Sequence, residues 1–244
     1  MLIALAENGE LVEAGEAPRR GEYLCPMCRS GVRLKQGPKI SAHFAHIPGS
    51  DCPCSEPESW RHLLSKQVLV EKLRWCGWNA RAEVVHPAAG RRIDVVAEAP
   101  FRGNAIGTFA IEVQDSAIQV DTMKERVAAD RKLGYDTTVW LFTNHRAARL
   151  MMAGPRDEVR VHDEMLWVDN RYRKGVSVID PVLRTITIVT FKTVLREQDP
   201  EYATTTWRSL RKTKRVERRP GDFFPKATAG RFGDRHTVSL DRLR

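Results

Sequence analysis

Hydrophobic and polar positions divide the chain into a turn-rich first part and a longer part that alternates helical and strand patterns. Residues 1–56 hold short strand-like pieces between glycine turns, and they are too few to build a sizeable hydrophobic core. Over residues 55–74 the apolar spacing becomes helical. Ser55 and Glu58 are spaced as a capping box, and Pro57 falls in the first turn, where proline is tolerated. We therefore expect a helix that begins near Ser55.

Strand and helix patterns then follow one another. Three segments have the residue types of strands, one has helical spacing, and a last apolar run is typical of a buried strand. In chain order they are Ala80–His86, Arg92–Ala97, Thr108–Gln114, Ile118–Leu133 and Thr137–Phe142. Together with the first helix, these segments predict the order α, β, β, β, α, β.

The remaining residues predict a smaller β region and a basic tail. Val159–Val168 and the alternating residues 184–188 are typical of strands. From Thr205 to Arg244 there are 12 Lys and Arg against 4 Asp and Glu, a net charge of +8. The sequence thus predicts an α/β protein with a small N-terminal module, a core, a β-rich C-terminal extension and a basic tail, at residues 1–56, 57–146, 147–204 and 205–244.

The charge balance points to an anionic partner. The chain has 40 Lys and Arg against 31 Asp and Glu, a net charge of +9, and nearly all of the excess lies in the tail. Basic residues bind the phosphates of nucleic acids without regard to sequence. We therefore expect the tail to contact an anionic partner such as a nucleic acid. The alternative is a solvated charged segment that only keeps the protein soluble.

Neither export nor membrane insertion is predicted. The first residues lack the basic stretch that precedes the apolar part of a secretory signal. No apolar run approaches the roughly 18 residues that a membrane span needs. We expect a cytoplasmic protein, in which clustered cysteines are more often metal ligands than disulfide partners.

Four of the five cysteines lie close together in the first part of the chain, beside two histidines. The spacing is Cys25-x2-Cys28, fourteen residues, His43-x2-His46, and Cys52-x-Cys54. Two cysteines separated by two residues can place both thiolates on one ion, and a later pair completes a tetrahedron. The pattern predicts a structural zinc site without a catalytic role, because protein ligands would fill all four positions. Spacing alone leaves the second pair open among His43, His46, Cys52 and Cys54. The alternative is a set of reduced thiols and ordinary surface histidines.

A second group of polar residues converges on the predicted sheet. Asp94 lies on the second strand, and Glu112 and Gln114 share one face of the third. Their apolar neighbours make an ionised carboxylate costly unless it has a partner. Mg²⁺ or Mn²⁺ is one such partner, and it would support hydrolysis of a phosphodiester bond. The alternative is a set of ion pairs with Arg91, Arg92 or a lysine of the helix.

The first helix adds three candidates for the same site. Glu58, His62, Lys66, Leu69 and Leu73 form one continuous stripe, and its apolar later members indicate that it faces inward. Glu58 would then be a third carboxylate, His62 a proton carrier or phosphate contact, and Lys66 a phosphate ligand. The alternatives are a capping role for Glu58 and a solvated Lys66.

Several motifs resemble those of the competence protein CoiA family of bacterial nuclease-like proteins. They are CPMC, RLKQGPKISAHFAHIPGSDC, ES-x2-H-x3-K, RIDV and AIEVQDS, in the family's order, and the opening ALAENGELVEA is similar too. The resemblance covers roughly residues 1–142. It implies a zinc-finger-like N-terminal module followed by a nuclease core of the PD-(D/E)XK class.

The resemblance also implies roles for individual residues. Asp94 and Glu112 would hold the catalytic ion. Gln114 stands where most PD-(D/E)XK nucleases have a lysine, although the CoiA-like branch itself carries Glu-x-Gln. An amide can orient the attacking water but supplies no positive charge, so Lys66 or His62 would compensate. For zinc, the family suggests Cys25, Cys28, one histidine and Cys52; we select His46, and Cys54 is then an extra cysteine.

Two functions are therefore expected. The first is a Mg²⁺- or Mn²⁺-dependent deoxyribonuclease that acts in DNA uptake and recombination, or in related DNA processing or defence, with recombination proteins as possible partners. The second is a nuclease-like DNA-binding or adaptor protein without turnover.

Overall fold

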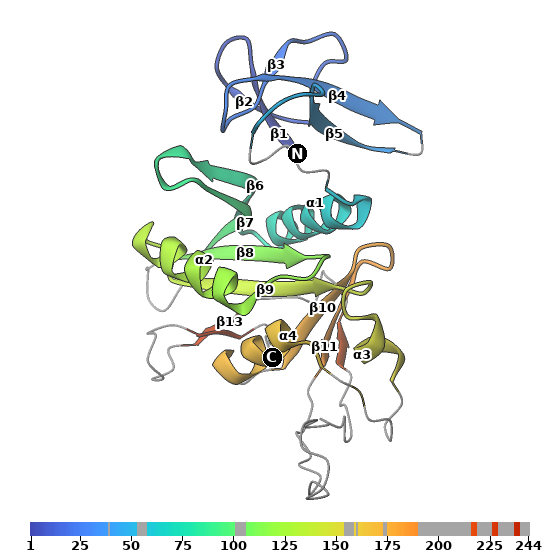
Figure 1. The fold of residues 1–244 in the computed structure, drawn as a ribbon, viewed down its shortest axis with the longest axis vertical. Helices are drawn as coiled ribbons and strands as arrows, with labels where there is room; N and C mark the ends of the chain where they lie inside the picture. Colours follow the sequence, from blue (N-terminus) through green and yellow to red (C-terminus); the bar gives the residue numbers. More distant parts are fainter. Residues whose placement is uncertain are drawn as a thin grey trace, which may run out of the picture.

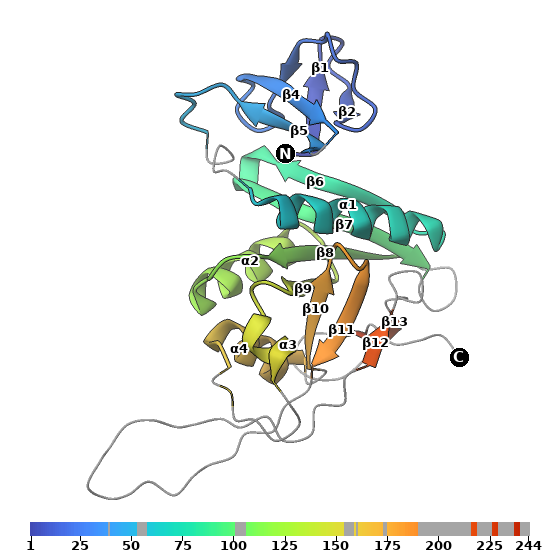
Figure 2. The same cartoon turned by 90° about the vertical axis from the view of Figure 1, so that its right-hand side faces the viewer.

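The computed structural model shows two larger β-sheets, of five and seven strands, stacked along the long axis of the molecule, with the first helix between them (Figures 1 and 2). The structure describes residues 1–38, 40–52, 58–100, 106–153, 159, 161–172 and 175–189, and the backbone of three short strands within 216–239. The side chains of residues 99, 100 and 106 and of those three strands are not among the described ones.

The N-terminal part forms a five-stranded antiparallel sheet in the order β2-β1-β3-β4-β5. Its strands are β1 (Ile3–Ala6), β2 (Leu11–Glu13), β3 (Tyr23–Leu24), β4 (Gly31–Gly37) and β5 (Ile40–His46). Its small core contains Tyr23 and Phe44 together with Cys25 and Cys52. Two of the predicted zinc ligands are therefore part of the packing that holds this sheet together.

Helix α1 (Trp60–Trp75) begins later than the sequence predicts. The N-cap is Ser59, whose hydroxyl accepts a hydrogen bond of 3.1 Å from the backbone N–H of His62. The prediction of a capping box formed by Ser55 and Glu58 is wrong, because Glu58 precedes the cap and binds other residues. Ser55 and Pro57 lie outside the described residues. The inward stripe is confirmed, since Lys66, Leu69 and Leu73 are buried.

A seven-stranded mixed sheet forms the centre of the molecule, in the order β12-β11-β10-β9-β8-β7-β6. Helix α2 (Val120–Lys132) makes the crossover between the parallel strands β8 and β9. The strands are β6 (Asn79–His86), β7 (Arg91–Pro100), β8 (Ile106–Gln114), β9 (Thr137–Thr143), β10 (Val176–Asp180), β11 (Thr185–Val189) and β12 (Val216–Arg218). The predicted order α, β, β, β, α, β is confirmed for α1 to β9, and the short 3₁₀ helix Pro87–Ala89 makes the turn between β6 and β7.

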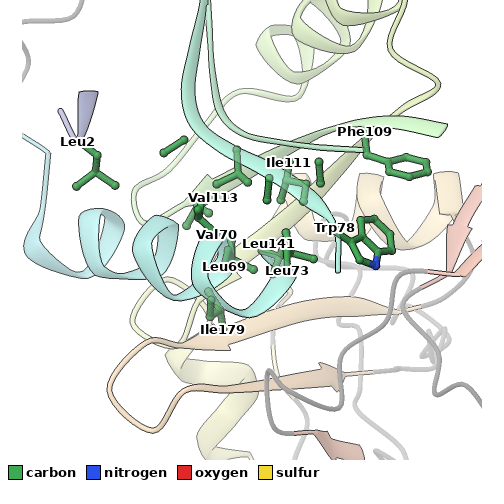
Figure 3. Packing of buried hydrophobic residues seen from close by; sticks show 14 of the residues in the cluster. Leu2, Leu69, Val70, Leu73, Trp78, Phe109, Ile111, Val113, Leu141 and Ile179 are labelled. Atoms are coloured by element: carbon green, nitrogen blue, oxygen red, sulfur yellow. The ribbon is translucent and has the colours of Figure 1, made fainter. Parts of the chain in front are cut away.

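Alternating residues of the strands point to opposite faces of the central sheet and belong to different hydrophobic clusters. On one face, Leu69 and Leu73 of α1 pack with Ile111, Val113 and Leu141 (Figure 3). On the other face, the neighbours of Leu141, Trp140 and Phe142, pack with residues of α2 and α4. Of the candidate-site residues, His62 lies on α1, whereas Glu112, between Ile111 and Val113 on β8, pairs with Arg126 of α2.

The region after β9 differs from the expected small β region. A helix, α4 (Asp163–Tyr172), stands where Val159–Val168 predicts a strand, and a short helix α3 (Ala148–Met152) precedes it. The strand prediction is wrong because Met165 and Val168, spaced three residues apart, are both buried against the sheet, which is helical spacing. Strands β10 and β11 extend the central sheet.

Most of the expected basic tail lies outside the described residues. Its described parts are the backbone of β12, β13 (Lys226–Thr228) and β14 (Thr237–Ser239), of which the last two pair with each other. None of the helices in the described part of the chain combines the length and the apolar character that a membrane span requires.

Candidate metal centres and active site

Three cysteines and one histidine of the N-terminal sheet meet at one point. We call Cys25, Cys28, His46 and Cys52 the Cys/His cluster; its four ligand atoms all lie within 4.8 Å of one another. The sulfurs of Cys25 and Cys52 are 3.9 Å apart, and the Cys28 sulfur is 3.5 Å from Nε2 of His46. A tetrahedral zinc ion places two sulfurs about 3.8 Å apart and a sulfur and a nitrogen about 3.5 Å apart. The cluster could therefore hold a zinc ion.

The geometry selects between the two histidines that spacing leaves open. His46 is in the cluster, whereas Nδ1 of His43 lies 2.8 Å from the carbonyl oxygen of Ser41. Cys54 lies outside the described residues. Burial raises the pKa of Cys28, but hydrogen bonds with Ser30 and His46 lower it to about 6, which favours the thiolate that binds metal.

A second group of ionisable residues lines a cavity of about 630 Å³ beside the start of α1. Glu58 and His62 reach it from the start of α1, Asp94 from β7, and Glu112 and Gln114 from β8. All of these are residues that the sequence singles out. Ligand atoms of Glu58, His62 and Asp94 lie within 4.8 Å of one another.

Asp94 occupies the point where the pairing of β7 with β8 ends. The paired residues run from Pro100–Ile106 to Val95–Ile111. The backbone N–H of Val113, two residues beyond the last pair, is therefore available to a side chain. Oδ2 of Asp94 accepts this N–H at 2.9 Å and lies 3.1 Å from Nε2 of His62. Burial alone would raise the pKa of Asp94, but the charges of His62 and Lys66 hold it well below its usual range.

Lys66 is fully buried and joins acids from two parts of the structure. Its Nζ lies 2.8 Å from Oε1 of Glu58 and 2.5 Å from Oε1 of Glu83 on β6. The other oxygen of Glu83 accepts the backbone N–H groups of Leu2 and Ile3 at 2.7 and 3.3 Å. The N-terminal sheet is thereby connected to the cavity through a buried carboxylate. The alternative of a solvated Lys66 is wrong.

His62 lies between two carboxylates. Its Nδ1 is 3.2 Å from Oε1 of Glu58, and its Nε2 faces Asp94. Burial alone would lower the pKa of His62, but Asp94 and Glu58 raise it to about 10. In the absence of a metal ion, His62 is therefore a cation at neutral pH, and it can donate a proton from either nitrogen.

Both carboxylate oxygens of Glu112 bind arginines. NH2 of Arg91 lies 2.7 Å from Oε1, and NH1 of Arg126 on α2 lies 2.9 Å from Oε2. Arg91 also binds Asp130 through two bonds of 2.9 and 3.2 Å. Burial and the nearby charge of Asp94 raise the pKa of Glu112, although the two arginines act in the opposite direction. The pairing with Arg91 is one of the ion pairs that the sequence offers as the alternative to a metal site.

Gln114 and Asp115 follow at the end of β8. The amide of Gln114 donates to the backbone and side-chain oxygens of Ser116 at 3.0 and 3.3 Å, and not to Glu112. Asp115 accepts hydrogen bonds from the hydroxyls of Ser59 and Thr143. It also forms an ion pair of 3.2 Å with Arg61. It therefore ties the N-cap of α1 to the end of β9.

Acids and bases are paired with one another around and beneath the cavity. We call this set the acid–base cluster, and its acids are Glu58, Glu83, Asp94, Glu112 and Asp130. Its bases are His62, Lys66, Arg91, Arg92 and Arg126. Such a site can carry protons, hold a phosphate against its cations, or exchange a cation for a metal ion.

Several members of the acid–base cluster were not found by sequence reasoning. Glu83 lies in a predicted strand, but its inward position depends on an unusual backbone with φ of 51°, which the sequence does not show. Asp130 and Arg126 lie four residues apart on α2, a spacing that places both on one face of that helix and was a usable signal. Asp115 directly follows the Glu-x-Gln segment, and this position alone could have identified it as a residue of the site.

Two family models match the chain in succession. The model described as competence protein CoiA, N-terminal domain, matches residues 10–55, and the model described as competence protein CoiA, nuclease-like domain, matches residues 58–155. Together they cover more than half of the 244 residues. The boundary between the two matches falls directly before Glu58, where the acid–base cluster begins.

Two known proteins are similar to parts of this chain. The competence protein CoiA of Bacillus subtilis is 27% identical over 120 residues, which is 48% of this chain and 30% of that protein. The Druantia protein DruB of Escherichia coli is 45% identical over 48 residues, 18% of this chain and 9% of that protein. The chain thus spans less than a third of the length of these relatives, and no solved structure matches it. From the two successive domain matches, the chain belongs to the competence protein CoiA family.

Proposed function

We propose that the chain is a metal-dependent nuclease that hydrolyses phosphodiester bonds of DNA in the cytoplasm. The observation that carries this proposal is the cavity of about 630 Å³ on which Glu58, His62, Asp94 and Glu112 converge, within a domain that the family describes as nuclease-like. The element order around this cavity is the one expected of a PD-(D/E)XK core.

The donor groups suit a small, hard cation. Asp94 and Glu112 would hold Mg²⁺ or Mn²⁺, with Glu58 as a third carboxylate, because these ions prefer oxygen ligands. The bound ion would lower the pKa of a water molecule and neutralise charge on the phosphate. The ion has to compete with the cations that now occupy these acids.

The remaining residues of the site have distinct roles in this proposal. His62, protonated between Glu58 and Asp94, would give a proton to the leaving oxygen. Lys66 is buried beneath it and would hold Glu58 and Asp94 in place, since its Nζ is 2.8 Å from the first and 3.9 Å from the second. Gln114, whose side chain lines the same cavity, would orient the attacking water.

Cleavage of single- and double-stranded DNA with Mg²⁺ or Mn²⁺ tests the proposal. The full chain is compared with Asp94→Ala and Glu112→Ala, and we expect each variant to lose at least about a hundredfold in rate, the scale of removing one charge-stabilising group. Thermal unfolding of each variant serves as the folding control. If all three proteins cut DNA equally, the nuclease proposal is wrong.

A second candidate function is a DNA-binding or adaptor protein without turnover. Two observations favour it. Both oxygens of Glu112 are bonded to arginines, and the amide of Gln114 is bonded to Ser116 and carries no charge that could assist the reaction. In that case the full chain binds DNA, and cleavage is absent with every divalent ion tested. DNA uptake and recombination, or defence, would then depend on recombination proteins that the chain recruits.

The basic tail is proposed to add phosphate contacts to either function. Removal of residues 205–244 takes away a net charge of +8. We expect weaker DNA binding and a shallower dependence of affinity on salt, because fewer counterions are released. Fluorescence anisotropy at several salt concentrations measures both quantities. Unchanged affinity and slope would show that the tail does not bind DNA.

A further inference from the structure

We propose that Arg126 is an exchangeable cation, which neutralises Glu112 until a divalent ion binds there and then contacts a phosphate of the nucleic acid. This inference rests on the proposed metal-dependent function, and it names the residue that the ion displaces. It assigns a role to a residue of α2 that is not among the predicted site residues.

The two arginines bound to Glu112 are held very differently. The side chain of Arg91 is 8% exposed, binds Asp130 twice, and donates to the carbonyl oxygen of Arg92 at 2.8 Å. Moving Arg91 would leave the buried acid Asp130 without this cation, which is strongly unfavourable. Arg91 is therefore a fixed part of the structure around Glu112.

Arg126 is the exchangeable partner. Its side chain is 39% exposed, and its guanidinium lies 2.9 Å from Oε2 of Glu112, the one ion pair it makes within the described part of the chain. Because the Arg126 side chain is only partly buried, it can reach both solvent and the cavity. Leaving Glu112 would cost Arg126 a single charge-assisted bond and little change in hydration.

A divalent ion suits the vacated oxygen better than the guanidinium does. Asp94 and Glu112 line the same cavity, and among the described residues Arg126 makes its ion pair with Glu112 alone. An ion between the two carboxylates would neutralise both. It would keep Oε1 of Glu112 on Arg91, so the fixed part of the network would remain intact.

The released guanidinium stays beside the same cavity, which Arg126 lines together with Thr122 and Glu125. Its planar pair of donors matches two oxygens of a phosphate group. Gln114, which lines the same cavity, carries no charge. Arg126 would therefore supply the positive charge that Gln114 does not.

Binding of Mn²⁺ without DNA tests the exchange. Isothermal titration of the full, zinc-loaded chain is compared with Arg126→Gln, which is expected to bind Mn²⁺ about ten- to a hundredfold more tightly, as loss of a competing charged hydrogen bond implies. Arg131→Gln is the matched control, because Arg131 lies on the same helix but lines a different cavity. It should bind Mn²⁺ like the wild type. Equal affinity of the wild type and Arg126→Gln would overturn the inference.

A second measurement separates the inference from the proposed function. DNA affinity is measured with and without Ca²⁺, an ion used here to occupy the site without rapid cleavage. Arg126→Gln should weaken binding about tenfold with Ca²⁺, the scale of one charge-assisted bond, and much less without it, because Arg126 then remains on Glu112. An equal loss in both conditions would contradict the exchange. If neither the wild type nor any variant binds a divalent ion at this site, the metal-dependent function fails as well.

Discussion

The Cys/His cluster and the acid–base cluster are both candidate metal sites, but they differ in how their ligand groups are balanced. In the first, three sulfurs and an imidazole face one another. In the second, each carboxylate already contacts a histidine, lysine or arginine of the protein. A zinc ion would thus be part of the fold at the first site, whereas an ion at the second would replace a cation that the protein supplies.

The two sites also differ in what surrounds them. The N-terminal sheet has a small core that includes Cys25 and Cys52 themselves, so ligand geometry and packing depend on each other. The acid–base cluster lies beside the hydrophobic cluster between α1 and the central sheet. We therefore expect loss of the ion to unfold the first region and to leave the second one folded.

Removal of zinc is expected to have the largest effect. Cys25→Ser should abolish stoichiometric zinc binding and unfold the N-terminal sheet, because zinc binding contributes about 10–16 kcal/mol in small zinc modules. Zinc content and circular dichroism measure both outcomes. Since Glu83 accepts N–H groups of Leu2 and Ile3, this variant should also weaken the acid–base cluster.

Two residues outside the Cys/His cluster, Cys54 and His43, provide the controls for zinc removal. Cys54→Ser should retain one zinc ion per chain, and His43→Ala should do so as well, since Nδ1 of His43 contacts the carbonyl of Ser41. Extraction of Mg²⁺ or Mn²⁺ from the zinc-loaded protein should leave the fold intact. A Cys25→Ser variant that remains fully folded and binds zinc would remove the distinction between the two sites.

Replacement of the buried Lys66 is expected to have the next largest effect. Lys66→Met leaves Glu58 and Glu83 without the cation that lies 2.8 and 2.5 Å from them, and breaking such a buried pair costs about 3–5 kcal/mol. Urea unfolding of the zinc-loaded protein measures this loss. Lys72→Met is the matched control on α1, because Lys72 is partly exposed and pairs with Glu71 at 3.7 Å. It should cost less than about 1 kcal/mol.

The Lys66 result would sharpen the comparison in either direction. A large loss, rescued in part by Glu83→Gln in the same chain, would show that internal cations hold the acid–base cluster together. A loss no greater than that of Lys72→Met would show that the acids are protonated or solvated. The cluster would then resemble the Cys/His cluster in needing an outside ion.

Sequence reasoning reached most of the fold and part of the site. The residues Asp94, Glu112, Glu58 and His62 could be found because strand alternation and helical spacing are local and bring them to one cavity. Glu83 could not, since its inward side chain depends on a positive φ that no pattern announces. The helix Asp163–Tyr172 was missed because Val159 and Val161 alternate like a strand directly before it. The helical spacing of Met165 and Val168, both buried, begins only after that alternating segment.

The pairing of Glu112 shows a different limit of the sequence. Arg91 was available as a partner from its position next to the second strand, and the alternative of ion pairs named it. Arg126 shares a helix face with Asp130, but its pairing with Glu112 could not be predicted, because the distance between them is set by the crossover of α2 over β8 and β9. Tertiary structure decides whether an acid binds a metal ion or an arginine. The spacing of residues in the sequence is compatible with both.

The titration of His62 is expected to have the smallest effect on stability. Its pKa rises from an ordinary 6.5 to about 10 in the folded protein, because Asp94 and Glu58 outweigh the effect of burial. A raised pKa means that protonated His62 stabilises the fold. This contribution is complete below about pH 6.5 and is lost as the pH rises towards 10. It amounts to a few kcal/mol at most, on the order of one kcal/mol per unit of pKa.

The measurement compares the wild type with His62→Gln in buffer without Mg²⁺ or Mn²⁺. Urea unfolding of both proteins at several values between pH 6 and pH 10 gives a difference in free energy, which should be largest at pH 6 and shrink as the pH rises. A titration of the imidazole by NMR should place its midpoint well above 7. A midpoint near 6.5, with a difference independent of pH, would mean that the carboxylates beside His62 are neutralised by something other than this imidazole. The acid–base cluster would then lack one of the internal cations that distinguish it from the Cys/His cluster.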